Sequence, residues 1–346
     1  MRVNISNALS LLRAGELVGI PTETVYGLAA DALNPTAVVK IFEAKNRPAF
    51  NPLICHLASA DAVFGFGKAN PLSERLAEFW PGPLTLLLKH ENRIPSIVTS
   101  GSEYCAFRVP AHKTALELLA STGPLAAPSA NKSGQVSPVR AEMVERAFGP
   151  DFPVIDGGPC EVGIESTICL AEKHGVRILR SGSITIEEIA GKGIPILEKQ
   201  AENAAVLAPG QALSHYAPAV PLVLLEEHVP PAEPMNSLGE TPNPAWASRW
   251  RDAGTDPARI AALDFHLPLP IDARIRFNLS EQGNLREAAR NLFFYFDLPG
   301  ASDIQMLVAA TVPDQGIGRA INDRLRRAAT HTGRIENGRL LILERA

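Results

Sequence analysis

The stretch KIFEAKNRPAFNPLICH, Lys40 to His56, joins a helical pattern to a strand pattern through a corner stiffened by proline. Apolar residues recur at helical spacing up to Lys45, and the pattern stops at Pro48, whose ring removes a helix hydrogen bond. An apolar run beginning at Leu53 then predicts a strand. A helix followed at once by a strand is typical of layered α/β folds, so this stretch indicates the fold class.

The same alternation extends over the first 190 residues. Strands are predicted at Leu17–Pro21, Leu53–Leu57, Leu84–Lys89, Cys105–Pro110, Leu125–Pro128, Pro153–Asp156, Ser166–Ala171 and Val176–Leu179. Helices are predicted at Ile5–Ala14, Pro35–Lys45, Pro71–Trp80, Lys113–Ser121, Pro138–Phe148 and Ile184–Ala190, with Ser137 as a helix cap. So many strands predict one large, twisted and mixed sheet in an α/β or α+β layered domain.

A second domain is predicted after a linker. Residues 191–220 lack periodicity, so we expect domains at 1–190 and 221–346 with the linker between them. The second domain has predicted strands at Pro221–Glu226, Arg259–Asp264, Ile304–Ala309 and Leu340–Leu343. Its predicted helices are Pro244–Asp252, Ser280–Phe296 and Gly318–Ala329, and Val229–Pro244 is a proline-rich insertion. These elements predict a smaller α/β unit.

Composition and charge narrow the functional classes. The 346 residues are 46% hydrophobic with a net charge of −4, and the acidic excess is the same before and after residue 190. Proteins that grip nucleic acid along its backbone need a basic surface, so any such contact is expected to be local or transient. No run approaches the ~20 apolar residues of a membrane span. The four cysteines form no CxxC pair, so we expect buried free thiols and a cytoplasmic protein.

Lys45 and Arg47 lie at the end of the helical pattern in the opening stretch. Lys45 falls seven residues after Val38 and shares the apolar helix face, so its side chain is expected to point inward. Two interpretations fit this pair. The cations cap the carboxyl end of the helix, where positive charge is favoured by ~0.3–1 kcal/mol. Alternatively, they form an anion site on a corner that Pro48 holds rigid.

Three further segments carry polar side chains beside predicted strands. They are PTETVYGLAA at Pro21–Ala30, APSANKSGQVSP at Ala127–Pro138 and DGGPCEVGIESTICL at Asp156–Leu170. Polar residues at strand ends are where α/β sheets bind ligands, although ordinary turns have the same composition. Arg108 and Arg180 each end an apolar run, and a buried arginine needs a structural ion pair or an anionic ligand.

The linker contains the segment PGQALSHYAP, Pro209–Pro218. His215 and Tyr216 lie between two prolines, which is unusual in a passive tether. They either dock the linker on a hydrophobic patch or fold back over the first domain as a lid. We favour the lid, because the prolines limit the slack of the segment.

Common catalytic signatures are missing from the sequence. There is no GxxxxGK[ST] loop, and Gly65-Phe-Gly67-Lys-Ala-Asn70 lacks the third glycine of a dinucleotide-binding turn. Neither the histidines nor the cysteines have the spacing of metal ligands. Bound phosphates would therefore be held by separate side chains and loop amides.

Taken together and in this order, the segments resemble the threonylcarbamoyl-AMP synthase family, also called the YrdC/Sua5 family. The matching pieces are PTETVYG, KNRPAFNPL, WPGPLTLLL (Trp80–Leu88), FRVPAH (Phe107–His112), APSAN with its following SG and SP, and GIESTI. The KxR and SxN signatures of the family match Lys45–Arg47 and Ser129–Asn131. HYAP and GIGRAINDRLRRAA (Gly316–Ala329) resemble the long, two-domain branch, although Gln211 stands where that branch has methionine.

The resemblance implies an enzyme that converts L-threonine, bicarbonate and ATP to threonylcarbamoyl-adenylate and pyrophosphate, with Mg²⁺ carried on the ATP and no structural metal. Its product serves the t6A modification of tRNA through a separate threonylcarbamoyltransferase, so contact with tRNA is indirect or transient. The first domain of the family is an open twisted sheet around a large electropositive cavity, and the second is Rossmann-like.

Residue roles follow from the same resemblance. Threonine is bound by Thr24, His56, Arg108 and Ser166, and by the backbone near Ala127. ATP is bound by Arg47, Asn51, Tyr104, Ser129, Asn131, Arg180 and Tyr216. Lys45 and Arg47 are the expected catalytic cations. The lid hypothesis then brings Tyr216 to the nucleotide, with His215 fixing the segment.

The chemistry of this reaction agrees with the residues. A carbamate and a triphosphate repel each other, so catalysis needs positioning and positive charge more than acid–base groups. Two alternatives remain: a non-catalytic RNA-binding module of the same fold, and an enzyme handling carbamoyl phosphate. An RNA site could use the basic run Asn322–Ala329, with Arg324, Arg326 and Arg327, which we expect instead to be a solvated helix face.

Overall fold

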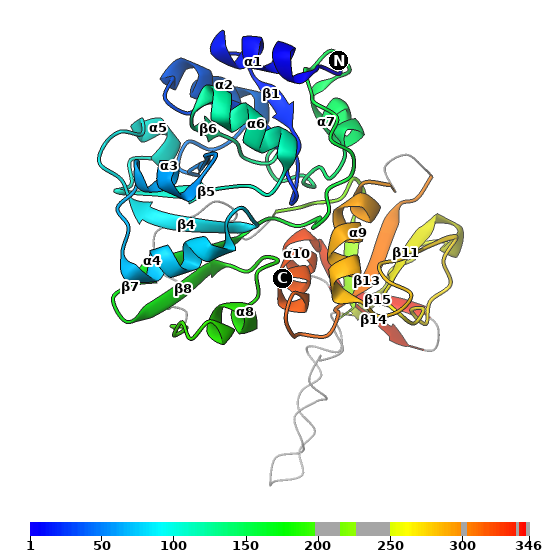
Figure 1. The fold of residues 1–346 in the computed structure, drawn as a ribbon. Coiled ribbons are helices and arrows are strands. Elements are labelled where there is room, and N and C mark those ends of the chain that lie inside the picture. Colours follow the sequence, from blue (N-terminus) through cyan, green and yellow to red (C-terminus); the bar gives the residue numbers. More distant parts are fainter. Residues whose placement is uncertain (198–214, 226–249, 299–302, 337–338, 344–346) are drawn as a thin grey trace. The chain divides into compact units, whose positions relative to one another are not determined.

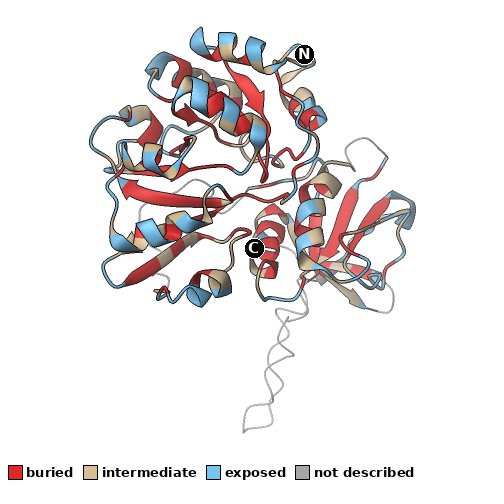
Figure 2. Ribbon diagram, in the orientation of Figure 1, coloured by how far each residue is buried: buried red, intermediate tan, exposed pale blue. Residues whose placement is uncertain are grey.

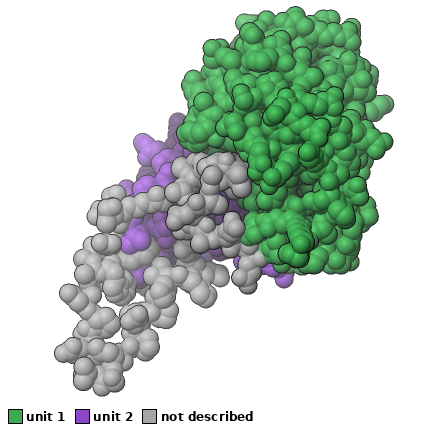
Figure 3. All heavy atoms as spheres, turned by 90° about the vertical axis from the view of Figure 1, so that its left-hand side faces the viewer, with its two compact units in different colours: residues 1–215 green, residues 216–346 purple. Residues whose placement is uncertain are grey.

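The computed structural model describes residues 1–197, 215–225, 250–298, 303–336 and 339–343. The chain divides into two compact units, Met1–His215 and Tyr216–Ala346 (Figure 3). Each unit contains its own sheet, in the α/β class that the sequence predicts (Figure 1). The proline-rich insertion 229–244 and most of the PGQALSHYAP segment lie outside the described residues.

The first unit is built on an eight-stranded mixed sheet with the strand order β1-β2-β6-β3-β5-β4-β7-β8. The strands are β1 (Val18–Ile20), β2 (Gly27–Asp31), β3 (Ile54–His56), β4 (Leu84–Lys89), β5 (Tyr104–Arg108), β6 (Leu125–Ala126), β7 (Thr167–Glu172) and β8 (Gly175–Arg180). β3 is parallel to β5 and β4 is parallel to β7, whereas the remaining neighbours are antiparallel. Their apolar residues are buried almost throughout, as Figure 2 shows.

Helices flank this sheet. They are α1 (Ile5–Arg13), α2 (Pro35–Lys45), α3 (Ala60–Phe64), α4 (Pro71–Leu76) continued by η1 (Ala77–Phe79), α5 (Ser96–Thr99), α6 (Lys113–Thr122), α7 (Ala141–Phe148) and α8 (Ile186–Gly191). In α2, the Asn34 side chain caps the first turn and Pro35 occupies a position where no backbone donor is needed. Asn46 ends the helix in a left-handed conformation with φ of 50°. The bounds of α2 are those predicted.

The core between α1, α6 and the neighbouring strands fixes one end of the sheet. Ala8 and Leu12 of α1 and Leu118 of α6 pack with Val18 and Ile20 of β1, and all five are at most 1% exposed. Burying apolar side chains of this size stabilises the folded state by ~1.5–3 kcal/mol each, as an upper estimate. The loop that follows β1 therefore starts from a rigid base.

Several predictions for the first unit need correction. β2 was not predicted as a strand, because the polar residues before it suggested a loop; it pairs with β1 as a hairpin. Ser137 caps no helix: α7 begins at Ala141, and the Ser137 hydroxyl donates to Glu165 Oε1 at 2.7 Å. The predicted strand Pro153–Asp156 is reduced to single bridges from Val154 to Arg2 and Gly19.

Some residues of the predicted linker are bonded to the first sheet. The backbone of Val176 in β8 exchanges hydrogen bonds with Pro195 and Leu197, at 2.8 and 2.9 Å. Residues 195–197 therefore extend the edge of the first sheet, and the boundary between the two units falls between His215 and Tyr216. Residues 198–214 lie outside the described part of the chain.

The second unit has a seven-stranded sheet in the order β10-β15-β14-β9-β13-β11-β12. Its strands are β9 (Leu222–Leu225), β10 (Trp250–Asp252), β11 (Ile260–Asp264), β12 (Ile275–Asn278), β13 (Met306–Ala310), β14 (His331–Glu336) and β15 (Arg339–Leu343). The five strands from β14 to β12 are parallel, which is the arrangement of Rossmann-like folds. The short helix η3 (Pro257–Arg259) precedes β11, and α9 (Leu285–Asp297) and α10 (Gly318–Ala328) pack together (Figure 1).

Three predictions for this unit also change. Residues 250–252 of the predicted helix Pro244–Asp252 form strand β10, and the rest of that range lies outside the described residues. α9 begins at Leu285 rather than Ser280, because Asn284 caps it and the Ser280 hydroxyl accepts a bond from the Asn284 amide. β12 and β14 were not predicted.

All four cysteines are free and buried, as predicted. Among the described residues, no helix is both long and apolar enough to cross a membrane.

Candidate active site

A row of side chains crosses the first sheet at matching register. His56 of β3 lies opposite Arg108 of β5, Thr85 of β4 lies opposite Ile168 of β7, and Ile168 lies opposite Arg180 of β8. The pairing of Leu86 with Phe107 places Thr85 beside Arg108 and completes the row. Because directly paired residues point to the same face of a sheet, this register gathers predicted site residues from separate parts of the sequence.

Arg108 is the centre of the first half of the site. Its Nη1 donates to Thr24 Oγ1 at 2.9 Å and its Nε donates to the Gly82 carbonyl at 3.2 Å. Its Nη2 lies 2.6 Å from Glu23 Oε1, and both side chains of this ion pair are 4% exposed. A guanidinium with this little contact with water needs such partners, so the arginine is held in one position.

Thr24 is fixed by the loop that joins β1 to β2. Thr22 Oγ1 lies 2.9 Å from Thr24 Oγ1 and donates to the Val25 carbonyl at 2.7 Å. The loop backbone is tied in turn to the segment 127–138, since Leu28 and Ala130 donate to Pro128 and Tyr26 carbonyls. The predicted polar segments are therefore brought together by backbone bonds.

His56 is buried beside Arg108. Burial, followed by the positive charge of Arg108, lowers the pKa of the imidazole to about 3. The ring is therefore neutral at physiological pH, and its Nδ1 has no hydrogen-bond partner among the described residues. A neutral imidazole can donate to or accept from a hydroxyl group.

Ser166 connects Arg108's neighbourhood to Arg180. The Ser166 hydroxyl lies 2.7 Å from Thr85 Oγ1 and accepts from Arg180 Nη2 at 3.0 Å. Arg180 also donates twice to the Ser166 carbonyl, at 3.0 and 3.1 Å. Gly182 makes this approach possible, because a side chain there would collide with the backbone of Ser166 and Thr167.

Lys45 holds the loop that carries Ser129 and Asn131. Its ammonium donates to the backbone carbonyls of both residues, and it is 1% exposed. Burial is the main cause of a pKa well below the ordinary lysine value, and the charges of Arg47 and Lys132 lower the pKa further. The inward direction expected for Lys45 is confirmed. The side chain is surrounded by the end of α2 and by this loop.

Arg47 lies on the proline corner with a different set of contacts. Its guanidinium donates to Asn51 Oδ1 and to the Pro52 carbonyl, each at 2.7 Å, and its Nε donates to the Asn51 carbonyl at 3.0 Å. Burial, followed by the charge of Arg180, lowers the pKa of Arg47 to about 10. The side chain therefore stays charged at neutral pH and is repelled electrostatically by Arg180, an arrangement that an anion would stabilise.

His215 reaches the same cations, although it lies far along the chain. Burial lowers the pKa of its imidazole to about 4; Glu165 raises this pKa, and Lys45, Arg47 and Arg180 lower it. His215 is the last residue of the first unit and lies within electrostatic range of these cations. The lid formed by the HYAP segment stays a prediction.

Tyr216 belongs to the second unit. Its ring stacks on Phe293 of α9 at 5.2 Å between centroids, and the Arg324 guanidinium lies 5.5 Å from the ring centre. The tyrosine is 1% exposed. These contacts anchor the HYAP segment in the core of the second unit, and the predicted role of Tyr216 with the nucleotide stays a prediction.

Tyr104 and Ala127 differ in their relation to the cation cluster, since Ala127 is two residues from Ser129, whose carbonyl Lys45 binds. Tyr104 begins β5, at the opposite end of the strand from Arg108. The Lys89 ammonium lies over its ring, 5.4 Å from the ring centre. The amide of Ala127 donates to the Ile54 carbonyl at 3.1 Å, so the backbone here continues the pairing of β6 with β3. Tyr104 shares none of the contacts that join the other predicted site residues.

Two residues in direct contact with the predicted site were missed. Glu23 and Thr85 are 4% and 0% exposed, and they touch Arg108 and Ser166 respectively. Glu23 lies inside the polar segment PTETVYGLAA. Its position between two threonines of that segment could have marked it as a site residue. Thr85 lies in an apolar strand pattern, so only the register reveals it.

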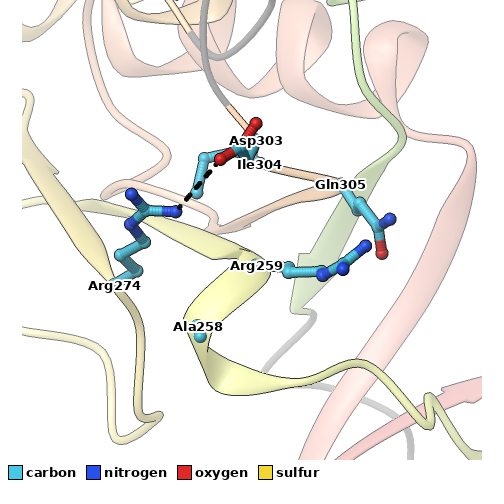
Figure 4. A pocket seen from close by; sticks show the side chains of 6 residues that line it. All are labelled: Ala258, Arg259, Arg274, Asp303, Ile304 and Gln305. Atoms are coloured by element: carbon cyan, nitrogen blue, oxygen red, sulfur yellow. Dashed lines mark ion pairs between the residues drawn. The ribbon is translucent and has the colours of Figure 1, made fainter.

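The second unit contains a hollow of about 430 Å³ lined by Ala258, Arg259, Arg274, Asp303, Ile304 and Gln305 (Figure 4). Arg274 points toward Asp303, but the two charges are 3.8 Å apart and their side chains are 52% and 89% exposed. The hollow also lies at the amino ends of β11 and β13, whereas α/β sheets bind ligands at the carboxyl ends. We therefore locate the candidate site in the first unit.

Within the described part of the chain, no group of three or more His, Cys, Asp or Glu side chains is arranged to hold a metal ion. The charged side chains around Arg47 are instead mostly cations. This set suits the oxygens of phosphates and carboxylates, which arginine binds with its planar fork.

The fold, with Arg108 and Arg180 buried on one face of the first sheet, defines an α/β domain whose candidate site suits anionic groups. A family described as "Telomere recombination", with the model name Sua5_yciO_yrdC, matches residues 10–182. A second, "Threonylcarbamoyl-AMP synthase, C-terminal domain", matches residues 184–330. The chain belongs to the threonylcarbamoyl-AMP synthase family, in its two-domain Sua5 form.

Relatives are similar over almost the whole chain. The threonylcarbamoyl-AMP synthase of Pyrococcus abyssi is 37% identical and covers 93% of each chain. That of Bacillus subtilis is 35% identical, over 94% of this chain and 92% of its own. The crystal structure of P. abyssi Sua5 complexed with L-threonine has a TM-score of 0.77, at 35% identity, over 95% of this chain and 96% of that chain.

Proposed function

We propose that this chain joins L-threonine, bicarbonate and ATP into threonylcarbamoyl-AMP and pyrophosphate, for the t6A modification of tRNA. Two relatives that carry the name of this activity align with more than nine-tenths of the chain. The observation that carries the proposal is the row from His56 to Arg180, which sets a site for a carboxylate beside a cluster of cations.

Threonine occupies the Arg108 half of the row in this proposal. Its carboxylate pairs with Arg108, and its hydroxyl meets Thr24 or the neutral ring of His56. Ser166 and the backbone near Ala127 complete the subsite. The P. abyssi relative is described with L-threonine bound, which supports an amino-acid site in this domain.

ATP occupies the other half. Arg47 and Arg180 contact the phosphates, Asn51 fixes Arg47, and the loop carrying Ser129 and Asn131 lies against the nucleotide. Lys45 positions that loop through its bonds to the Ser129 and Asn131 carbonyls. Contacts of Tyr104 and Tyr216 with ATP are kept as expectations from the family resemblance.

This arrangement supplies what the reaction needs. A carbamate oxygen attacks the α-phosphorus, the bond to the departing pyrophosphate breaks, and negative charge accumulates on the phosphate oxygens. Fixed cations stabilise that charge without rearranging during the reaction. Mg²⁺ arrives on the ATP as part of the substrate. The carbamate hydrolyses readily in water, so closure over it is also needed.

The product passes to a separate threonylcarbamoyltransferase, and tRNA is met indirectly or transiently. We place the reaction in the cytoplasm, where ATP and tRNA are both available.

Pyrophosphate release by the purified chain tests the proposal. Release should require threonine, bicarbonate and ATP together, and mass spectrometry should identify threonylcarbamoyl-AMP. Arg180→Ala should abolish most of this signal, whereas Arg13→Ala, on an exposed helix end, serves as a matched control. Tight RNA binding without pyrophosphate release would favour the RNA-binding alternative instead.

A further inference from the structure

Glu23 is a buried carboxylate whose acceptor capacity is largely unused. Its side chain is 4% exposed and lies 2.6 Å from Arg108, yet neither carboxylate oxygen accepts an aligned hydrogen bond among the described residues. An ionised carboxylate can accept about four hydrogen bonds. Buried polar atoms are nearly always satisfied, so two unsatisfied oxygens at one position need an explanation.

The position of Glu23 is fixed by its neighbours. Its carbonyl accepts from the Val162 amide at 2.8 Å, and both flanking threonines have bonded hydroxyls. The oxygens are therefore not poorly placed because the loop is loose. Arg108 is likewise incomplete, because its Nη2 makes an ion pair with Glu23 but no aligned hydrogen bond.

The pair has the charge pattern that complements an α-amino acid. An amino acid carries a carboxylate and an ammonium on one carbon, and Arg108 and Glu23 offer one cation and one anion side by side. A zwitterion can replace the Arg108–Glu23 contact by two new contacts, so no net charge enters the buried site. A carboxylate without an amine would take Arg108 and leave Glu23 buried without a cation, which is strongly unfavourable.

We propose that Glu23 binds the α-amino group of the amino-acid substrate while Arg108 binds its carboxylate, so that the site selects zwitterions. This inference rests on the proposed function, since it deepens the threonine subsite. Glu23 is then a specificity-determining residue, and it holds the nitrogen that must acquire the carboxyl group.

Binding measurements on the wild-type chain provide the first test and need no variant. Calorimetry compares L-threonine with (3R)-3-hydroxybutanoate, which is threonine without its amino group. Threonine should bind at least tenfold more tightly. Equal affinity for the two ligands would overturn the proposal, whereas absence of threonine binding, together with absence of threonine-dependent pyrophosphate release, would count against the proposed function itself.

Variants of Glu23 provide the second test. Glu23→Gln should weaken threonine at least tenfold and 3-hydroxybutanoate less than twofold, so the preference largely disappears. Glu23→Asp keeps the charge and should keep most of the preference, with weaker binding of both ligands. Glu161→Gln, an exposed acid whose charge also reaches Cys160 and His112, is the matched control and should change neither affinity.

A role limited to holding Arg108 would give a different result. Glu23→Gln would then weaken both ligands by the same factor, and the preference for threonine would remain, which would overturn the proposal. Should Glu23→Gln not fold, as judged by thermal unfolding, Glu23→Asp and the wild-type comparison still decide the question. Loss of the preference in Glu23→Asp, where the charge is retained, would also contradict it.

Discussion

Arg47 and Lys45 are separated by a single residue, but their contacts give them different tasks. Arg47 stays charged and meets Arg180 electrostatically, whereas Lys45 is buried and bonded to the loop of Ser129 and Asn131. In our account, Arg47 stabilises phosphate charge directly, and Lys45 acts largely through the loop it holds. The KxR signature thus combines a contact residue with a positioning residue.

We expect Arg47→Ala to lower kcat/KM by about 10²–10³, the usual loss when a fixed electrostatic donor is removed. Lys45→Ala should lower it comparably and also lower the thermal unfolding temperature, because the loop carbonyls lose their donor. Steady-state pyrophosphate assays and calorimetry measure both effects. Lys40→Ala is the control, because this half-buried lysine of the same helix bonds Gly15 and Glu16 rather than the site. Near-normal turnover in both site variants would contradict the assignment.

His56 should make the fold sensitive to acid. Its pKa is about 3 in the folded chain and 6.5 ordinarily, so the unfolded state binds the proton more readily between these values. Stability is therefore complete above pH 6.5 and falls as pH drops toward 3, by at most about 1.4 kcal/mol per pH unit. Thermal unfolding at pH 7, 6 and 5 should show a smaller decrease for His56→Gln than for wild type. Identical pH dependence would show that His56 is not buried in its neutral form.

At the scale of helices and strands, local signals determined what the sequence could predict. α2 was predicted to the residue because Asn34, Pro35 and Pro48 mark its ends. β4 was predicted equally well from a continuous apolar run. β2 was missed because the polar residues before it suggested a loop. Its strand conformation depends on pairing with β1 more than on its own composition. The row from His56 to Arg180 depends on strand register, which arises from long-range pairing and has no local signal.

The basic run on α10 also shows that local sequence does not reveal long-range contacts. It was expected to be a solvated face, but Arg324 is fully buried, beside Tyr216 and 3.1 Å from Asp323. Arg326 is exposed, and Arg327 pairs with Asp323 at 2.9 Å. The expectation therefore holds for Arg326, in part for Arg327, and is wrong for Arg324.

Substitutions on α10 should separate stability from activity. Charge reversal of Arg326 and Arg327 should leave pyrophosphate release within about twofold, because exposed charge pairs contribute only ~0.3–0.5 kcal/mol. Arg324→Ala should destabilise the second unit by on the order of 3 kcal/mol, because a fully buried side chain, its ion pair with the partly exposed Asp323 and its ring contact are lost. Calorimetry and activity assays together test this. A large loss of synthesis after reversal of Arg326 and Arg327 would mean that this helix face takes part in the reaction.

At the scale of the whole molecule, the HYAP segment contributes to both units. His215 lies with the cations of the first unit, and Tyr216 is held in the second by Phe293 and Arg324. The sequence indicated that this segment was more than a tether, but not that its two central residues divide between units. We propose that the second unit anchors the segment and thereby controls closure of the site, a kind of gating that can limit turnover.

Truncation tests this division. Chains ending at residue 197 keep the bonds between Val176 and Leu197 but lose His215, so they should bind threonine and make threonylcarbamoyl-AMP more slowly, or lose it to hydrolysis. Ending the chain at residue 190 also removes those bonds and should lower stability. His215→Ala in the full chain is the matched variant and should resemble the longer truncation. If residues 1–197 form and retain the product as well as the whole chain does, the gating account is wrong.

We propose that one face of the first sheet holds both substrates, threonine at Arg108 and ATP at Arg47 and Arg180. A crystal structure with L-threonine and a non-hydrolysable ATP analogue tests it most directly. We predict the threonine carboxylate within hydrogen-bonding distance of Arg108, and the phosphates in contact with Arg47 and Arg180. Either ligand bound away from this row, or ATP bound to the second unit, would contradict the account.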